Sequence, residues 1–377
     1  MNTNRSHRWR LFQIGSIAVT IHYLLLGIGL SIPLATTTSY RIMTKTWFDH
    51  FLQWDGIWYI AIAKHGYIIP IKVQEAWFAI INSIPFHPAW KAAAFFPGLP
   101  FVIASLGPIT ALLVGNLVFI ISILLIAHMV MKERGKRTAM FAAVLIAVNP
   151  GSLYFSTLYA EPYLLFFTIL IYYGLSLRNR QGNALAIGSA LLLSFMDKLG
   201  VLSVVFSLSY FRQRQVGKGI LLILCSLCGW IVFALYLALL TGHPFAFVQS
   251  EQAWGRSLHP PLVNFIIGIE KKDWIDVFFG VLDGYLIILY LFHSLDSLAL
   301  KLFVFFDFIL VLCDYPIFTP LMSILRLWGI LWPVYLHAAT FSQNDRRATV
   351  RYAIVVVLFA SVTVIGSALV THGHFYQ

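Results

Sequence analysis

The feature that most constrains this chain is a series of apolar runs, each long enough to cross a membrane, that recurs from one end of the sequence to the other. A bilayer has a hydrocarbon layer of about 30 Å, which a helix of about 20 apolar residues crosses. Only 11% of the 377 residues are charged, against roughly 25% in soluble domains. A helix satisfies its own backbone hydrogen bonds in lipid. The sequence therefore predicts an all-α polytopic membrane protein, with residues 1–377 as a single integral membrane domain.

Basic residues in the predicted loops indicate the orientation of the chain. We expect about eleven transmembrane helices, at residues 11–34, 108–130, 138–150, 161–177, 184–196, 199–211, 219–241, 275–294, 298–313, 321–341 and 352–371. Basic clusters lie at residues 5–10, 132–137, 178–180, 212–218 and 346–351. With eleven crossings these clusters all fall on one side, which the positive-inside rule assigns to the cytoplasm. The N-terminus is then cytoplasmic, and residues 35–107 and 242–274 form the two large non-cytoplasmic loops.

The first of these loops contains an aromatic-rich stretch with a carboxylate in its middle, QWDGIWYIAIAKHGY at residues 53–67. Large apolar side chains recur in and before it at three- and four-residue steps, at Phe48, Phe51, Trp54, Trp58 and Ile62. This spacing predicts a helix that lies in the membrane interface. Asp55 would then lie near the level of the lipid headgroups, where the phosphate of a lipid-linked substrate also lies.

Five further segments stand out, and their order along the chain is informative. They are AAAFFPGLP at 92–100, NPGSLYFSTLYAEPYLLFF at 149–167, SFMDKLGVL at 194–202, PFAFVQSEQAWGRSLHPP at 244–261 and LRLWGILWPVYL at 325–336. With the stretch at 53–67, this ordered set resembles the GPI mannosyltransferase 2 (PIG-V-like) family, in its bacterial branch, of the GT-C class of multi-spanning glycosyltransferases. The resemblance implies a GT-C-like fold, a polyprenyl-phosphate sugar donor and an inverting transfer of a hexose, with mannose as the sugar, on the non-cytoplasmic face.

The resemblance also implies roles for individual residues. Asp55 matches the family's WD aspartate, which the resemblance implies is catalytic, Glu161 matches its Y-[TA]-E glutamate and Arg256 its AWGR arginine. Two segments depart from the family's pattern. Residues 197–200 read Asp-Lys-Leu-Gly in place of Arg-Ser-Asn-Gly, and residues 325–327 keep only the arginine of Pro-Arg-Tyr. These departures bear on the identity of the acceptor more than on the class of reaction.

Transfer from a lipid monophosphate needs a base near the acceptor hydroxyl and cations near the departing phosphate. Asp55 is the candidate base. Arg256 and Arg326 are the candidate ligands of the donor phosphate, because a guanidinium binds phosphate through two N–H groups. Glu161 would orient the acceptor or pair with a cation such as Lys198 in a charge network. Plainer roles are a helix cap for Asp55, a helix-dipole partner for Glu161 and headgroup contacts for the two arginines.

Tryptophans and histidines complete the set of candidate residues. Trp54, Trp58 and Trp254 would stack on sugar rings or anchor the chain in the interface. The twelve histidines show no metal-ligand spacing such as HExxH. We therefore expect no metal site and no obligatory cofactor, and leave a divalent cation open as an alternative.

The predicted partners are a polyprenyl-phosphate-linked sugar donor, a glycolipid or glycan acceptor and membrane lipids. The net charge of +11 lies in loops and not on the face of a folded domain, so we predict no nucleic-acid partner. A polytopic transporter or lipid flippase is the alternative function, although the internal repeats common in transporters are not evident. We expect the protein in a bacterial cytoplasmic membrane, or in the endoplasmic reticulum membrane of a eukaryote.

Overall fold

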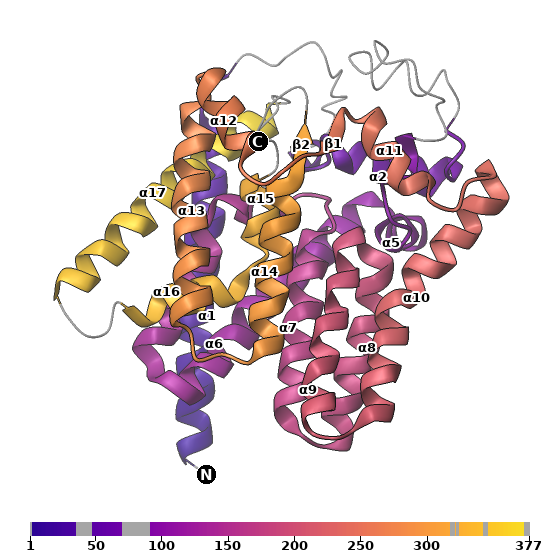
Figure 1. Ribbon diagram of the computed structural model, residues 1–377. Coiled ribbons are helices and arrows are strands. Elements are labelled where there is room, and N and C mark those ends of the chain that lie inside the picture. The colour runs from indigo at the N-terminus through magenta and orange to yellow at the C-terminus, as the bar shows by residue number, and fades with distance from the viewer. Residues whose placement is uncertain are drawn as a thin grey trace.

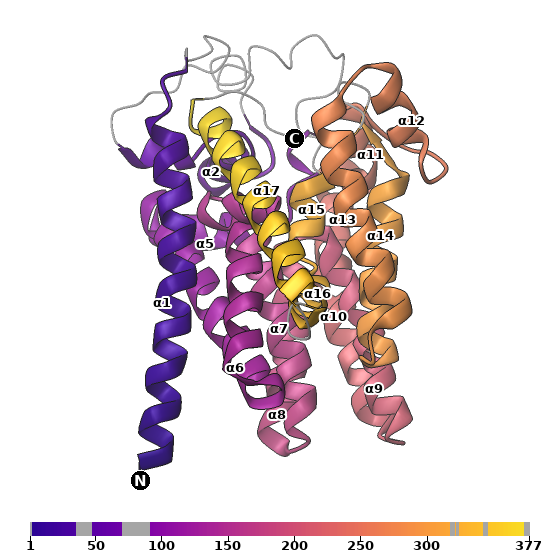
Figure 2. The same ribbon diagram turned by 90° about the vertical axis from the view of Figure 1, so that its left-hand side faces the viewer.

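Helices that run along one common direction make up most of the molecule in its computed structural model (Figures 1 and 2). The structure describes residues 2–34, 47–69, 91–316, 321, 324–341 and 346–372. The helical elements are α1 (Asn2–Ser31), η1 (Trp47–Phe51), α2 (Asp55–His65), α5 (Gly98–Leu106), α6 (Pro108–Val148), η3 (Pro150–Ser156), α7 (Glu161–Leu177), α8 (Arg180–Met196), η4 (Lys198–Phe206), α9 (Ser207–Arg212), α10 (Val216–Thr241), α11 (Ala246–Ala253), α12 (Val263–Glu270), α13 (Trp274–His293), α14 (Leu298–Cys313), α15 (Ile324–Gly329), α16 (Trp332–Phe341) and α17 (Arg346–Thr371). Two short strands, β1 (Arg256–Leu258) and β2 (Asp314–Pro316), pair antiparallel.

Several of these helices are long and apolar enough to cross a membrane. Five qualify by length and composition, at Ser6–Ser31, Pro108–Val148, Val216–Thr241, Asp276–His293 and Arg347–Thr371, and the bent pair of η3 and α7 would make a sixth. The chain is thus an integral membrane protein built from helices, as its sequence predicts. Where the structure describes the other predicted spans, it also places helices in them, but α7 and α8 have only 17 residues and α14 has 16. The number of eleven crossings stays a prediction.

Two breaks divide the helices between Pro108 and Leu177. Gly135 interrupts α6 with a φ of 85°, a left-handed conformation that glycine adopts without a steric penalty. This break falls between the predicted spans 108–130 and 138–150. After α6, η3 and α7 meet at an angle of 100°. Pro150 is the first residue of η3 and Pro162 is the second residue of α7, positions where a missing backbone N–H costs no hydrogen bond. Irregular backbone at membrane depth is tolerated where it faces protein or a polar site.

The predicted basic loops meet at one end of the helical bundle. Nη2 of Arg134 lies 3.9 Å from Oδ1 of Asp296, in the turn between α13 and α14. Arg137 donates through Nη2 to the Thr349 hydroxyl of α17 at 3.2 Å. The N-terminus of the chain and α9 lie at this same end (Figures 1 and 2). We call it the basic end.

The described parts of the two predicted non-cytoplasmic loops lie at the opposite end of the bundle, which holds α2, α11, α12 and the β1–β2 pair (Figure 1). In this pair Arg256 lies opposite Pro316, and Leu258 lies opposite Asp314. The predicted loop 35–107 is described only over 47–69 and 91–107, and the rest of it lies outside the described residues. Polar segments far apart in the sequence are therefore gathered at one end.

The predicted interfacial helix differs from what the structure shows. The chain from Phe48 to Ile62 is not one continuous helix: η1 ends at Phe51 and α2 begins at Asp55. Between them Trp54 has a φ of 55°. The apolar side chains of α2 pack against protein, since Trp58 is 1% exposed and Ile62 is also buried. A helix that faces lipid and one that faces a protein core share the same three- and four-residue spacing, so the sequence pattern could not distinguish them.

Candidate active site

Arg326 lies at the centre of the charged residues at the end of the bundle opposite the basic end. Its Nη1 donates to Oδ2 of Asp55 at 2.7 Å, and its Nε donates to Oε1 of Glu161. The three side chains come from α15, α2 and α7, and we call them the Arg326 network. The Arg326 side chain is 15% exposed, that of Asp55 25% and that of Glu161 5%. One guanidinium thus holds two carboxylates that are far apart in the sequence.

The close approach of two glycines brings α15 to this position. A Cβ atom on Gly151 of η3 would lie 2.5 Å from the backbone oxygen of Leu325 and 3.0 Å from the Cα of Gly329. Any larger side chain at Gly151 would push α15 away from η3. On its other side η3 is tied to α1, where Nε2 of the buried His22 lies 2.8 Å from the Ser156 hydroxyl.

Asp55 and Glu161 each occupy the first turn of a helix. Their carboxylates therefore lie where the helix dipole favours negative charge. Oε1 of Glu161 binds Arg326, but Oε2 is buried and has no hydrogen-bond partner among the described residues. A buried carboxylate oxygen of this kind is suited to accept a hydrogen bond from a ligand hydroxyl.

Two buried tyrosines lie against the guanidinium of Arg326. Its Cζ lies 4.6 Å from the ring centroid of Tyr159 and 5.3 Å from that of Tyr154. The two rings are 5.1 Å apart. A guanidinium is attracted to aromatic faces within about 6 Å, and the contact also fixes the plane of the group. Both tyrosines belong to the segment 149–167 that the sequence singled out, but neither was predicted to be a site residue.

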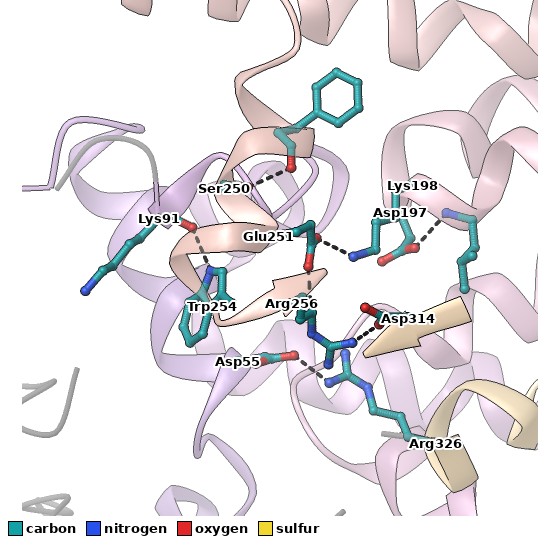
Figure 3. Close-up of polar contacts among 12 residues, drawn as sticks. Asp55, Lys91, Asp197, Lys198, Ser250, Glu251, Trp254, Arg256, Asp314 and Arg326 are labelled. Atoms are coloured by element: carbon teal, nitrogen blue, oxygen red, sulfur yellow. Dashed lines mark hydrogen bonds and ion pairs between the residues drawn. The ribbon is translucent and has the colours of Figure 1, made fainter. Parts of the chain in front are cut away.

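A second set of charges lies beside the first (Figure 3). Lys198 of η4 pairs with Glu251 of α11, and Arg256 of β1 pairs with Asp314 of β2. Nε of Arg256 lies 3.7 Å from Oε2 of Glu251 and joins the two pairs. We call these four residues the Glu251 network. Neither Glu251 nor Asp314 was predicted from the sequence.

The Glu251 network bears on two of the expectations from the sequence. Glu161 pairs with a cation, as expected, but this cation is Arg326, and the partner of Lys198 is Glu251. Arg256, expected to bind phosphate, is already engaged by two carboxylates. Burial alone would raise the pKa of Glu251, but the charges of Lys198 and Arg256 outweigh it and hold that pKa below its ordinary value. The charge of Arg326 lowers it as well, so the two networks act on one another.

The three predicted tryptophans contribute packing around the site. Trp58 is 1% exposed, and its ring centroid lies 5.3 Å from that of Trp254 and 5.8 Å from that of Phe95. This burial differs from the expectation of a ring that stacks on sugar or anchors in the interface. Trp254 donates through Nε1 to the backbone oxygen of Lys91 at 3.2 Å. Trp54 lies at the break before α2 and is half-buried.

No group of three or more His, Cys, Asp or Glu side chains in the part of the chain that the structure describes is arranged to hold a metal ion.

The fold and the two networks together define a helical membrane protein with a charged site at one end of its bundle. A family model described as Mannosyltransferase (PIG-V) matches residues 28–242, more than half of the chain. The chain therefore belongs to the PIG-V mannosyltransferase family. The match includes Asp55, Glu161 and Lys198 and ends before Arg256 and Arg326. Membership of its bacterial branch stays a prediction. No curated protein matches the chain.

Two solved structures of an oligosaccharyltransferase from Archaeoglobus fulgidus are similar to the chain. One, a complex with Zn and sulfate, is 12% identical with a TM-score of 0.45, over 92% of this chain and 53% of that chain. The other, tethered through a disulfide bond to an acceptor peptide containing the NVT sequon, is 12% identical with a TM-score of 0.46, over 98% of this chain and 56% of that chain. The chain thus spans about half the length of either oligosaccharyltransferase chain. The family assignment rests on the family model alone.

Proposed function

We propose that the protein is a membrane glycosyltransferase that moves a hexose, most simply mannose, from a polyprenyl-phosphate donor to a glycolipid or glycan acceptor on the non-cytoplasmic face. The observation that carries this proposal is the 2.7 Å contact between Asp55 and Arg326, at the end of the bundle opposite the basic loops. Membership of a mannosyltransferase family supports it.

In the proposed reaction the acceptor hydroxyl oxygen attacks C1 of the donor sugar from the side opposite the phosphate. The bond between C1 and the phosphate oxygen breaks, and its electron pair leaves with the phosphate. The hydroxyl proton passes to Asp55, and the configuration at C1 is inverted. Because phosphate leaves as an anion, no general acid is required, in contrast to the two carboxylates of glycosidases.

Because Asp55 is paired with Arg326, binding of the donor phosphate to Arg326 would change the hydrogen bonds of the proposed base. Nη2 of Arg326 makes no hydrogen bond to any residue that the structure describes. A phosphate that accepts from Nη1 and Nη2 together would replace Oδ2 of Asp55 at Nη1. The carboxylate is then free to accept the proton of the acceptor hydroxyl. Glu161 keeps its contact with Nε, which holds the guanidinium in place during the exchange.

Glu161 also supplies a candidate contact to the acceptor. Its Oε2 is buried without a partner in the described part of the chain, and a sugar hydroxyl donated to it would satisfy this oxygen. One carboxylate of the Arg326 network would then take the proton while the other orients the sugar.

The test is transfer of radiolabelled mannose from a short-chain polyprenyl-phosphate-mannose to a membrane extract. We expect label with the wild type and a loss of at least about 10³-fold with Asp55→Asn, which keeps the shape and removes the basicity. Asp49→Asn is the matched control, because it changes another acid of the same segment, in η1. Equal label with Asp55→Asn and the wild type would remove Asp55 as the base. No label with the wild type, combined with movement of the lipid across vesicle membranes, would favour the flippase alternative.

A further inference from the structure

Tyr159 contacts two members of the Arg326 network, Asp55 and Arg326, and lies close to the third in the sequence. Its hydroxyl accepts a hydrogen bond from the backbone N–H of Asp55 at 3.3 Å. Its ring faces the guanidinium of Arg326 at 4.6 Å. It also lies two residues before Glu161, and it is buried. No other residue described here joins the backbone of Asp55 to the guanidinium in this way.

The segment that carries Tyr159 is itself fixed against the start of α2. The backbone N–H of Leu158 donates to the backbone oxygen of Phe51 at 3.0 Å. A Cβ atom on Gly56 would lie 3.4 Å from Cβ and from the backbone oxygen of Leu158. The first turn of α2 therefore rests directly on the residue next to Tyr159, so movement of one would move the other.

The start of α2 needs such a support. The first N–H groups of a helix have no partner within the helix, and Asp55 is the first residue of α2. The preceding Trp54 has a φ of 55°, a conformation that is costly for a bulky residue and persists only where its surroundings impose it. The Tyr159 hydroxyl supplies the missing partner to the Asp55 N–H. The direction of the Asp55 carboxylate then depends on this bond.

We propose that Tyr159 is a positioning residue that aligns the carboxylate of Asp55 with the guanidinium of Arg326, an inference that rests on the function proposed above. The hydroxyl holds the backbone of Asp55, and the ring holds the plane of Arg326. One side chain thus positions both the Asp55 carboxylate, which would receive the proton, and the Arg326 guanidinium, which would bind the phosphate.

The experiment compares Tyr159→Phe, Tyr159→Leu and the control Tyr163→Phe. Tyr159→Phe keeps the ring and removes the bond to Asp55, so we expect kcat to fall about tenfold or more while KM for polyprenyl-phosphate-mannose stays within twofold. Tyr159→Leu removes the ring as well, and we expect it to raise that KM. The Tyr163 hydroxyl is buried without a partner among the described residues, so Tyr163→Phe should leave both constants within twofold of the wild type.

A second measurement does not depend on activity. Hydrogen–deuterium exchange of the peptide that contains residues 51–58 should be faster in Tyr159→Phe than in the wild type, and unchanged in Tyr163→Phe. Unchanged exchange overturns the proposal, and so does faster exchange with an unchanged kcat, because Tyr159 would then support α2 without aligning the base. If the wild type transfers no sugar, the proposed function fails while the exchange measurement still decides whether Tyr159 holds Asp55.

Discussion

Among single residues, Arg326 makes two kinds of contact, with carboxylates and with aromatic rings, that usually involve different side chains. It binds Asp55 and Glu161 through Nη1 and Nε, and it lies against the rings of Tyr154 and Tyr159. A planar group with several N–H donors can make these contacts at once. A lysine ammonium is a compact point charge, which neither stacks in the same way nor presents a planar pair of donors to phosphate.

This difference leads to a prediction for Arg326→Lys. We expect KM for the polyprenyl-phosphate donor to rise at least about tenfold and kcat/KM to fall about 10²-fold, because a bidentate phosphate contact is lost. Initial rates at varied donor concentration measure both. Arg134→Lys at the basic end is the control and should stay within twofold of the wild type. An unchanged donor KM would show that Arg326 does not bind the phosphate.

Much of the Arg326 network could be predicted from the sequence, and the reason lies in particular residues. Asp55, Glu161 and Arg326 each interrupt an apolar surrounding, so each was visible as a candidate, and the structure brings the three together. Tyr154 and Tyr159 were missed because aromatic residues form 16% of the chain and two more give no contrast. Glu251 and Asp314 were missed because an ion pair between distant segments leaves no periodic pattern in the sequence. Arg256 and Asp314, for example, are 58 positions apart.

On the scale of secondary-structure elements, the Glu251 network connects segments that are far apart in the sequence. It links η4, α11 and the β1–β2 pair, of which α11 has 8 residues and each strand 3. Such short elements bury little apolar surface. Their position over the site therefore depends on charge pairs to a larger degree than that of the long helices.

We predict that Glu251→Gln destabilises this end of the protein in a pH-dependent manner. At pH 7 we expect a loss of about 1–2 kcal/mol, seen as a melting temperature in detergent lower by about 2–4 °C. The loss is moderate because Lys198 is 37% exposed and water screens the pair. The control is Glu270→Gln at the exposed end of α12.

The sign of the pH dependence follows from the lowered pKa of Glu251. A carboxyl whose pKa is lower in the folded state stabilises that state above its unfolded pKa of about 4.3, and the contribution is lost as pH falls through the folded value. The melting temperatures of wild type and Glu251→Gln should therefore differ at pH 7 and converge below about pH 4. If the two melting temperatures differed by the same amount at both pH values, the ion pairs of Glu251 would be ruled out as the cause of the difference.

For the whole molecule, the separation of its two ends gives a prediction about the membrane. The basic clusters gather at one end and the charged site at the other, and positive residues favour the cytoplasm. In a background without Cys225, Cys228 and Cys313, an impermeant maleimide applied to intact cells should label His259→Cys. It should label Gln181→Cys only after the membrane is opened. Labelling of both variants from the same side would contradict the orientation.

The 100° bend before α7 also has a consequence for the thickness of the bilayer. α7 has 17 residues and so measures about 26 Å, less than the roughly 30 Å of a typical hydrocarbon layer. A helix that starts at Glu161 and ends at the basic end sets the site below the plane of the headgroups or thins the lipid around it. In the proposed reaction, a sugar carried on a lipid phosphate would then meet Arg326 without leaving its leaflet. We therefore expect longer acyl chains in the host membrane to move the proposed donor and the site apart, and to affect the rate much as a lower substrate concentration does.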